Sequence, residues 1–274
     1  MGKLDGKVAF ITGAARGQGR SHAVKLASEG ADIIATDSCT DTKTAAYPMA
    51  TEEDLAETVR QVEALDRRIV ATKADVRDHD HLKEVVAAGV AELGRLDIVS
   101  ANAGICTLQE WNEVTPEIWQ ETIDINLTGV WNTCMAAIPH LLAAGGGSII
   151  ITSSTAGRKG LPFFAPYVAA KTGVVGVAKS LANELGERNI RVNTVHPTGV
   201  NTNMLDGLGG MSAIIEHHPK LGPLYENALP VELIEAEDIS NAVLWLASDE
   251  ARFVTGAQLR IDAGGYLKWY DYHN

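Results

Sequence analysis

Cysteine is scarce in this sequence, and long apolar runs are missing. The 274 residues include 3 cysteines, Cys39, Cys106 and Cys134, which lie far apart and form no Cys-x-x-Cys pair. An odd number of separated cysteines argues against a disulfide framework and against a zinc site, and it fits a reducing cytoplasm. No run of about 18 apolar residues occurs, so no transmembrane helix is expected.

Positive charge is also in short supply. The chain has 23 Lys and Arg against 35 Asp and Glu, which gives a formal net charge of -12. Such an acidic chain is repelled by phosphate backbones and by anionic membranes, so nucleic acid and lipid surfaces are not expected partners. The opening residues, MGKLDGKVAFITG, lack the apolar stretch of a signal peptide, which also favours a cytoplasmic location.

The sequence does contain a regular alternation of short apolar runs and longer helical patterns. The runs are nearly continuous in Val, Ile, Leu and Ala, as in strands buried on both faces of a parallel sheet. The expected strands are Val8–Thr12, Asp32–Asp37, Arg68–Ala74, Leu96–Ala101, Ser148–Thr152, Ile190–Val195 and Ala257–Ile261. The expected helices cover residues 18–30, 52–65, 79–92, 116–144 (as two helices), 165–187 and 236–248. With no internal repeat and no flexible linker, the pattern predicts a single α/β domain over residues 1–274.

Three segments do not fit simple connections. Residues 38–50 separate a strand from a helix where about two to six residues would suffice, and residues 199–234 follow the sixth strand. Long loops in compact domains are usually lids or binding loops, so we expect the first near a cofactor and the second around a substrate. A solvent-facing excursion is the alternative for the first. The aromatic tail 266–274 is interpreted as a subunit contact or a lid from a neighbour, with a frayed terminus as the alternative.

The first expected strand runs into the motif TGAARGQG. Gly13, Gly17 and Gly19 are spaced as G-x3-G-x-G directly before a helical pattern. Glycine lets the backbone turn tightly and approach a diphosphate, and a helix N-terminus offers free N–H groups and a positive dipole end. The motif predicts a dinucleotide site that includes Arg16 and Gln18; a tight turn without a ligand is the alternative.

Asp37 ends the second expected strand, where a carboxylate can accept both adenosine ribose hydroxyls. It would also repel the 2′-phosphate of NADP, at a cost on the order of 1–4 kcal/mol. Arg16 is the counter-argument, since it could pair with that phosphate. We weigh Asp37 more heavily and expect NAD rather than NADP.

Polar or small residues also follow the third and fourth strands. Asp75 and Val76 follow the third, and Asn102, Ala103 and Gly104 follow the fourth. Ligands bind at the carboxyl ends of strands in open parallel sheets, so Asp75 is expected to contact adenine, with a helix cap as the alternative.

Four residues predict dehydrogenase chemistry. Tyr167 and Lys171 lie four residues apart in an expected helix and therefore share a face. The ordinary tyrosine pKa, about 10, is too high for a base near neutrality, but an ammonium and an oxidised nicotinamide would lower it. Ser154, just past the fifth strand, is placed to bond a substrate oxygen. Asn126 is a poor helix former within a helical pattern, which indicates a polar duty such as holding a water. A buried Tyr beside a surface Lys is the alternative.

Weaker signals lie elsewhere in the chain. The tract Asp78-His79-Asp80-His81 looks like a metal site but is expected to open a helix, with no metal bound. The pair His217–His218 is expected in solvent rather than in the substrate pocket. Trp111 is expected either to pack at an interface or to wall an apolar substrate site.

These motifs resemble the short-chain dehydrogenase/reductase family over the whole chain. The matching residues are TGAARGQG, Asp75–Val76, NAG at 102–104, Asn126, Ser154, Tyr167 and Lys171. The stretch from Pro197 to Met204 is similar to a family segment in which Val200 and Thr202 would contact the nicotinamide amide. The resemblance implies a Rossmann-type, doubly wound, seven-stranded and mostly parallel sheet with helices on both faces, usually in a homotetramer.

Within the family, GAARGQGRSHAVKLASEGADIIATD and AAYPMATEEDLAETVRQVEALDRR resemble the mycofactocin-associated subgroup, which includes carveol dehydrogenases. That resemblance implies a tightly held NAD that passes electrons to an external acceptor, and a cyclic terpenoid alcohol as substrate. The expected reaction interconverts a secondary alcohol and a ketone, with Tyr167 as the base and Lys171 holding the nicotinamide ribose. An ordinary ketoreductase with exchangeable NAD(H) and a non-catalytic NAD-binding sensor are the alternatives.

Overall fold

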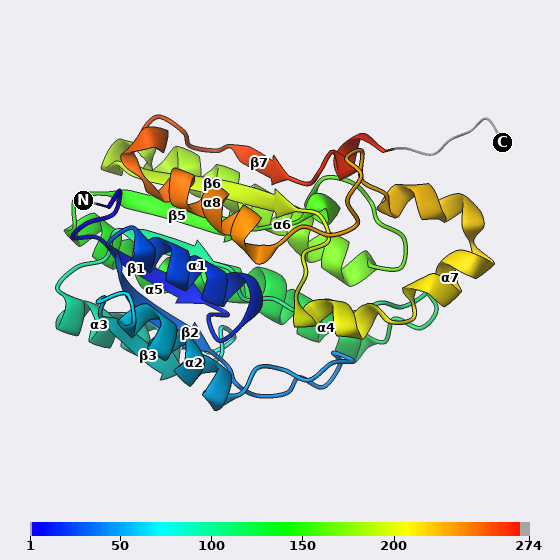
Figure 1. Cartoon of the computed structure of the whole chain (residues 1–274), viewed down its shortest axis with the longest axis horizontal. Coiled ribbons are helices and arrows are strands. Elements are labelled where there is room, and N and C mark those ends of the chain that lie inside the picture. The colour runs from blue at the N-terminus through cyan, green and yellow to red at the C-terminus, as the bar shows by residue number, and fades with distance from the viewer. Residues whose placement is uncertain (1, 269–274) are drawn as a thin grey trace.

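The computed structural model describes residues 2–268 and is built around a seven-stranded sheet in the order β3-β2-β1-β4-β5-β6-β7 (Figure 1). The strands are β1 (Val8–Thr12), β2 (Asp32–Asp37), β3 (Ile69–Lys73), β4 (Ile98–Ala101), β5 (Gly147–Thr152), β6 (Ile190–Pro197) and β7 (Gln258–Ile261). Each pairing is parallel, which confirms the predicted doubly wound sheet. The strand order reverses between β1 and β4, and ligands bind beside such a switch point in open α/β sheets.

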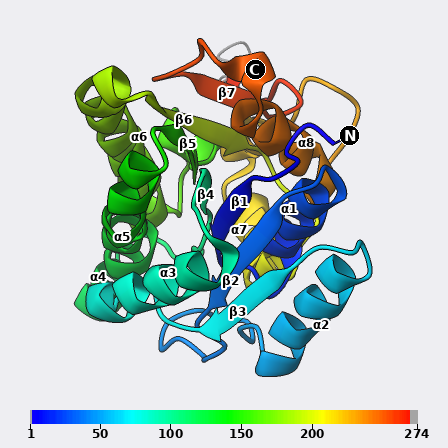
Figure 2. The same cartoon turned by 90° about the vertical axis from the view of Figure 1, so that its left-hand side faces the viewer.

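Helices cover both faces of the sheet (Figure 2). One face carries α1 (Gly17–Ser28), α2 (Glu52–Glu63) and α8 (Ala236–Ala247); the other carries α3 (His79–Leu93), α5 (Gly129–Ala143) and α6 (Ala165–Leu185), with α4 (Pro116–Ile123) against α6. The two helices expected within 116–144 are confirmed. A π-helical turn, η1 (Asp124–Thr128), joins them, and such turns are frequent at functional sites.

The apolar strands are explained by burial on both sides. Every residue of β1 is buried, and Phe10 and Ile11 point to opposite faces of the sheet. Phe10 belongs to the core that α3, α5 and α6 close, whereas Ile11 belongs to the core under α1 and α8. The two cores fix the positions of the strands, and therefore the positions of the polar residues at their carboxyl ends.

The expected loop 199–234 contains short helices. They are the 3-10 helix η4 (Asn203–Leu208), α7 (Met211–His217) and the 3-10 helix η5 (Pro219–Tyr225). Together they form a lobe beyond the carboxyl ends of the strands (Figure 1). Helices this short are marginal on their own and depend on tertiary contacts, so the local pattern did not reveal them.

The acidic and histidine-rich tract opens α3, as predicted. Asp78 caps the helix by accepting a hydrogen bond from the His81 backbone N–H at 3.0 Å, and Asp80 lies in the first turn. Within residues 2–268, no three potential metal ligands gather, and no helix has the length and apolar character to cross a membrane.

The expected tail contact lies mostly outside the described residues, which end at position 268. Of that tail, the Tyr266 ring packs 5.1 Å from the guanidinium carbons of both Arg158 and Arg260.

Candidate active site

A cavity of about 380 Å³ runs along the carboxyl ends of the strands. Its volume falls within the range that is typical of small-molecule sites. Nearly all the residues selected from the sequence line it: Gly13, Arg16, Gly17, Gln18, Gly19, Asp37, Asp75, Val76, Asn102, Ala103, Gly104, Ser154, Tyr167, Lys171, Pro197, Val200 and Thr202. The fold thus brings together residues that are up to about 190 positions apart in the chain.

Side chains do not fit in the glycine turn because its backbone packs closely, and its three glycines line the cavity. A Cβ on Gly19 would lie 1.9 Å from the Gly13 carbonyl oxygen, and Gly13 and Gly17 have φ angles of 67° and 55°. No side chain caps the N-terminus of α1, so its first N–H groups face the cavity end unshielded. A diphosphate fits such a cradle.

Asp37 is oriented by the backbone around it. Its Oδ2 accepts a hydrogen bond from the Ala15 N–H at 3.1 Å, and its Oδ1 accepts one from the Cys39 N–H at 3.2 Å. Burial raises the pKa of Asp37, and these two N–H groups oppose the rise. Arg16 is turned toward the 38–50 segment, where its guanidinium donates to the Pro48 carbonyl oxygen at 2.5 Å. Because the Arg16 guanidinium is held there, it is less available to pair with the 2′-phosphate of NADP.

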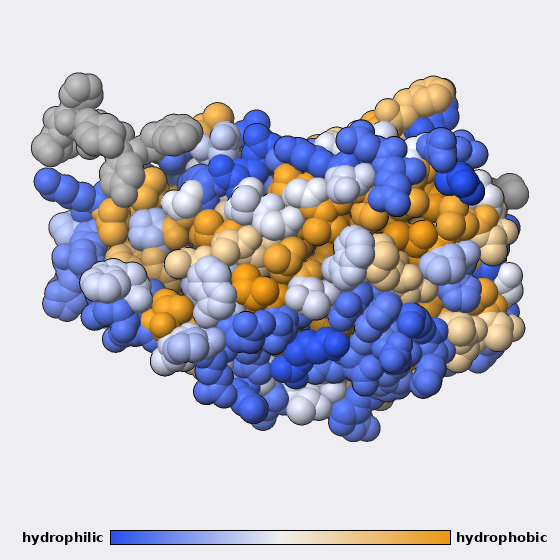
Figure 3. Space-filling model, turned by 180° about the vertical axis from the view of Figure 1, so that it is seen from behind, coloured by the Kyte–Doolittle hydropathy of each residue, from blue (hydrophilic) through white to orange (hydrophobic). Residues whose placement is uncertain are grey.

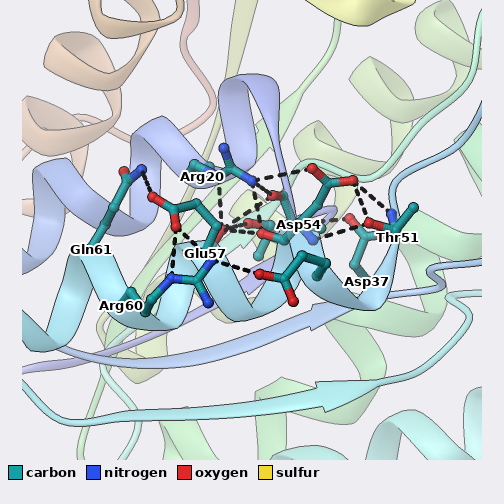
Figure 4. Close-up of polar contacts among 11 residues, drawn as sticks. Arg20, Asp37, Thr51, Asp54, Glu57, Arg60 and Gln61 are labelled. Atoms are coloured by element: carbon teal, nitrogen blue, oxygen red, sulfur yellow. Dashed lines mark hydrogen bonds and ion pairs between the residues drawn. The ribbon is translucent and has the colours of Figure 1, made fainter.

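The start of α2 is hydrogen-bonded through Arg20 to the glycine turn (Figure 4). Arg20 on α1 donates to the carbonyl oxygens of Ala15 and Asp54, at 2.5 and 2.8 Å. Thr51 and Asp54 form a capping box at the beginning of α2. The polar residues that follow the 38–50 segment therefore hold the turn in place.

The 38–50 segment packs onto the cavity instead of extending into solvent, and its position near a cofactor remains a prediction. Five of its residues line the cavity: Ser38, Thr42, Tyr47, Met49 and Ala50. Tyr47 and Ala50 are only 7% and 8% exposed.

A buried carboxylate on α4 anchors this segment. Oε2 of Glu121 accepts hydrogen bonds from the Thr44 N–H and hydroxyl, at 2.9 and 2.7 Å. Oε1 accepts from the Lys43 N–H and from the Arg77 guanidinium, both at 3.3 Å. Nothing in the local sequence singled out Glu121, because its partners are 44 to 78 positions away.

Asp75 lines the cavity and pairs with Arg77. Its Oδ2 lies 2.6 Å from the Arg77 guanidinium, which holds the pKa of Asp75 down against the opposing effect of burial. The alternative that Asp75 caps α3 is wrong, since Asp78 is the cap.

Tyr167 and Lys171 meet at the other end of the cavity, as their spacing predicted. The Lys171 ammonium lies 5.5 Å from the centroid of the Tyr167 ring and donates to the Thr152 carbonyl oxygen at 2.8 Å. The Ser154 side chain lies close enough to the Tyr167 hydroxyl to lower its pKa. One alcohol oxygen could therefore contact both hydroxyls.

The expected lowering of the Tyr167 pKa requires both the Lys171 ammonium and an oxidised nicotinamide, so it remains a prediction. In the protein without a cofactor, desolvation raises the pKa of Tyr167, the nearby Cys106 adds to the rise, and the Ser154 side chain opposes it. Burial also lowers the pKa of Lys171, to about 8, which weakens it as a source of positive charge. A phenolate at this position needs a further positive charge in the cavity.

Asn126 is fully buried in the π-helical turn. Its Oδ1 accepts from the Ile105 N–H at 2.8 Å, and its Nδ2 donates to the Ile105 carbonyl oxygen at 2.7 Å. The side chain thus fixes the backbone that follows the NAG motif. The expected water-holding role of Asn126 remains a prediction.

Sequence reasoning missed His196. Its Nδ1 donates to the Ser154 carbonyl oxygen at 2.8 Å, and its Nε2 accepts from the Thr194 hydroxyl at 2.8 Å. Burial lowers the pKa of His196 to about 4, so the ring is neutral near pH 7. A neutral histidine therefore holds the backbone of Ser154 in place.

Apolar side chains line much of the cavity beside the 199–234 segment, together with the charged residues Lys159, Glu226 and Glu232. The apolar residues are Leu161, Phe164, Leu205, Leu208, Met211 and Leu224. The 199–234 segment supplies four of these apolar residues, and its role as a substrate loop remains a prediction. Trp111 is 85% exposed and does not line the cavity, and His217 is exposed as expected.

Comparisons with known proteins agree with this geometry. A family model described as enoyl-(acyl carrier protein) reductase matches residues 13–266. The chain is 48% identical over 277 residues to (-)-trans-carveol dehydrogenase of Rhodococcus erythropolis, covering 98% of this chain and 100% of that protein.

Two solved structures are similar to this one. A short chain dehydrogenase from Mycobacterium paratuberculosis bound to NAD has a TM-score of 0.95 and 51% identity, covering 97% of this chain and 100% of that one. A carveol dehydrogenase from Mycobacterium avium in complex with NAD has a TM-score of 0.89 and 50% identity, covering 98% and 100%.

Proposed function

Because the chain belongs to the short-chain dehydrogenase/reductase family, we propose that it oxidises a secondary alcohol with NAD as hydride acceptor and Tyr167 as base. The observation that carries the proposal is the meeting of Ser154, Tyr167 and Lys171 in a cavity that also contains the glycine turn. A non-catalytic NAD sensor would have no need for the catalytic group.

The residues at the glycine end would hold the dinucleotide. The turn from Gly13 to Gly19 would bind the diphosphate, Asp37 the adenosine ribose, and Asp75 and Val76 the adenine. Asn102, Ala103 and Gly104 line the wall between the two ends of the cavity. Pro197, Val200 and Thr202 would flank the nicotinamide, and Lys171 would bind its ribose.

Bound NAD would accept the hydride and, in its oxidised form, add the positive charge that a Tyr167 phenolate needs. Ser154 donates a hydrogen bond to the alcohol oxygen, and Tyr167 removes the hydroxyl proton. The Lys171 ammonium stabilises the phenolate, while Asn126 would hold a water that links Lys171 to solvent. General base catalysis of this kind contributes a factor of about 10²–10⁴ in rate.

The apolar lining favours an alicyclic substrate such as a cyclic terpenoid alcohol. Apolar walls exclude water and reward burial of ring carbons by about 0.8 kcal/mol per CH₂. The similarity to carveol dehydrogenases in sequence and in structure points the same way. We therefore propose carveol-type secondary alcohols as substrates.

We further propose that the chain belongs to the mycofactocin-associated subgroup, with an NAD that stays bound between turnovers and an external electron acceptor. The support is the 38–50 segment, which lines the cavity and is tied down by Arg16 and Glu121. A covered cofactor leaves slowly, so electrons must go to a second molecule. The free cysteines are consistent with a cytoplasmic location.

The test uses the purified protein and its Tyr167→Phe variant. Denatured wild type should release NAD, and native wild type should oxidise carveol with dichlorophenolindophenol as acceptor and without added NAD. The variant should retain NAD and lose turnover. An NAD-free protein that needs added NAD would be the ordinary ketoreductase. An NAD-containing protein that turns over no alcohol in a broad panel would be the sensor.

We also propose a homotetramer. Apolar residues form a band over the face that α5 and α6 cover (Figure 3). Trp119 on α4 and Trp131 and Leu142 on α5 are 44%, 42% and 40% exposed. A contiguous apolar face of this kind marks an interaction site, and light scattering should give the mass of four chains.

A further inference from the structure

Tyr47 is the one aromatic residue of the 38–50 segment. It belongs to the 38–50 segment, between the anchor of Thr44 on Glu121 and that of Pro48 on Arg16. Its side chain is 7% exposed and lines the cavity. Unlike those two anchors, it extends toward the catalytic end.

The Tyr47 hydroxyl contacts backbone next to the catalytic group. Its oxygen accepts a hydrogen bond from the Cys106 N–H at 3.3 Å. The preceding residue, Ile105, is held on both sides of its backbone by Asn126. Burial raises the pKa of Tyr47 to about 12, so the phenol is neutral across the physiological range. The 38–50 segment is therefore linked to the same stretch of backbone that Asn126 fixes.

The Tyr47 ring contacts the substrate lobe. A Cβ on Gly207 would lie 2.3 Å from Cδ1 of Tyr47 and 3.0 Å from its Cε1, so the ring rests directly on the glycine backbone. Gly207 is part of η4, which also carries the cavity-lining residues Leu205 and Leu208. A glycine is needed here because any side chain would displace the ring.

We propose that Tyr47 is a positioning residue that holds both the 38–50 segment over the cofactor and η4 beside the substrate. Losing its ring should therefore weaken the binding of both molecules. The proposal rests on the proposed function. On this proposal, the 38–50 segment does more than cover the adenosine half of NAD. Through the Tyr47 side chain, it also sets the position of η4 beside the substrate.

The experiment compares four variants of the full-length protein. Tyr47→Ala removes the ring, and Tyr47→Phe removes only the hydroxyl. Thr44→Val removes an anchor on the cofactor side, and Thr40→Ala is a matched control because Thr40 is exposed in the same segment. Two quantities are measured: the rate at which bound NADH leaves during displacement by excess NAD, and the KM for carveol with dichlorophenolindophenol.

Tyr47→Ala should raise both the release rate and the KM by about tenfold or more. Tyr47→Phe should restore the KM to near wild type and raise release by about two- to tenfold, as expected for one neutral hydrogen bond. Thr44→Val should change release alone, and Thr40→Ala neither quantity. A Tyr47→Ala protein with the wild-type fold that shifts only one of the two quantities overturns the proposal. Wild-type protein without alcohol turnover would instead refute the proposed function, so the two failures are distinguishable.

Discussion

Replacing Glu121 with glutamine should release the bound cofactor. The carboxylate is only 8% exposed and accepts four hydrogen bonds, two from Thr44, one from Lys43 and one from Arg77. Glutamine keeps one acceptor oxygen but turns an NH₂ group toward the other two donors. The two long contacts at 3.3 Å would be lost, and the two short ones would become neutral hydrogen bonds.

These contacts set the expected increase in the rate of NADH release. Hydrogen bonds to a charged group are worth about 1.5–3 kcal/mol each and neutral ones about 1 kcal/mol. Because the lost contacts are long, we expect the closed position of the 38–50 segment to weaken by about 3 kcal/mol in total. At about 1.4 kcal/mol per factor of ten, NADH should leave on the order of 100-fold faster.

The assay is the displacement of NADH by excess NAD, followed by fluorescence, with the melting temperature as a check on folding. Glu117→Gln is the matched control, since Glu117 lies one turn earlier on α4, is 64% exposed and pairs with Lys43 only at 4.0 Å. Exposed pairs contribute little, so this variant should release NADH within about twofold of wild type. If folded Glu121→Gln also behaved like wild type, the 38–50 segment would not be what retains the cofactor.

Three other predictions concern catalysis, cofactor choice and pH. Tyr167→Phe should lower kcat by at least about two orders of magnitude while leaving the NAD content unchanged; unchanged turnover would refute the role of the phenol. Asp37→Ala should improve NADP binding relative to NAD by about tenfold or more, since it removes a repulsion of about 1–4 kcal/mol between the carboxylate and the 2′-phosphate. An unaltered preference for NAD in a binding titration would show that Asp37 does not select the cofactor. Burial lowers the pKa of His22 to about 3 and that of His196 to about 4, below the ordinary value of 6.5. The unfolded chain therefore binds more protons than the folded one between about pH 4 and 6.5, so stability falls with falling pH in that window. The free energy of unfolding should drop by about 3–4 kcal/mol between pH 7 and 5. Urea midpoints that coincide at these two pH values would contradict this prediction.

The Tyr47 and Glu121 contacts join the 38–50 segment to other parts of the cavity wall and of the chain. Both residues join segments far apart in sequence: Tyr47 reaches Cys106, 59 positions away, and Glu121 reaches Thr44, 77 positions away. Neither contact has a sequence motif, because the partners lie far away in the chain and are mainly backbone N–H groups. Only the packed structure distinguishes them from other residues of their kind.

The amino-acid sequence alone is sufficient to predict the sheet, the glycine turn and the pairing of Tyr167 with Lys171. These are local properties: apolar runs that require burial on both faces, glycines that a close backbone approach requires, and a four-residue spacing that places two side chains on one face of a helix.

The tertiary structure alone decided the proton affinities and the anchoring of the 38–50 segment. Desolvation raises the pKa of Tyr167 and lowers that of Lys171, because a pKa depends on everything that surrounds a group and not on its neighbours in the chain. In the same way, the buried position of Glu121 results from contacts with residues that only the fold brings close.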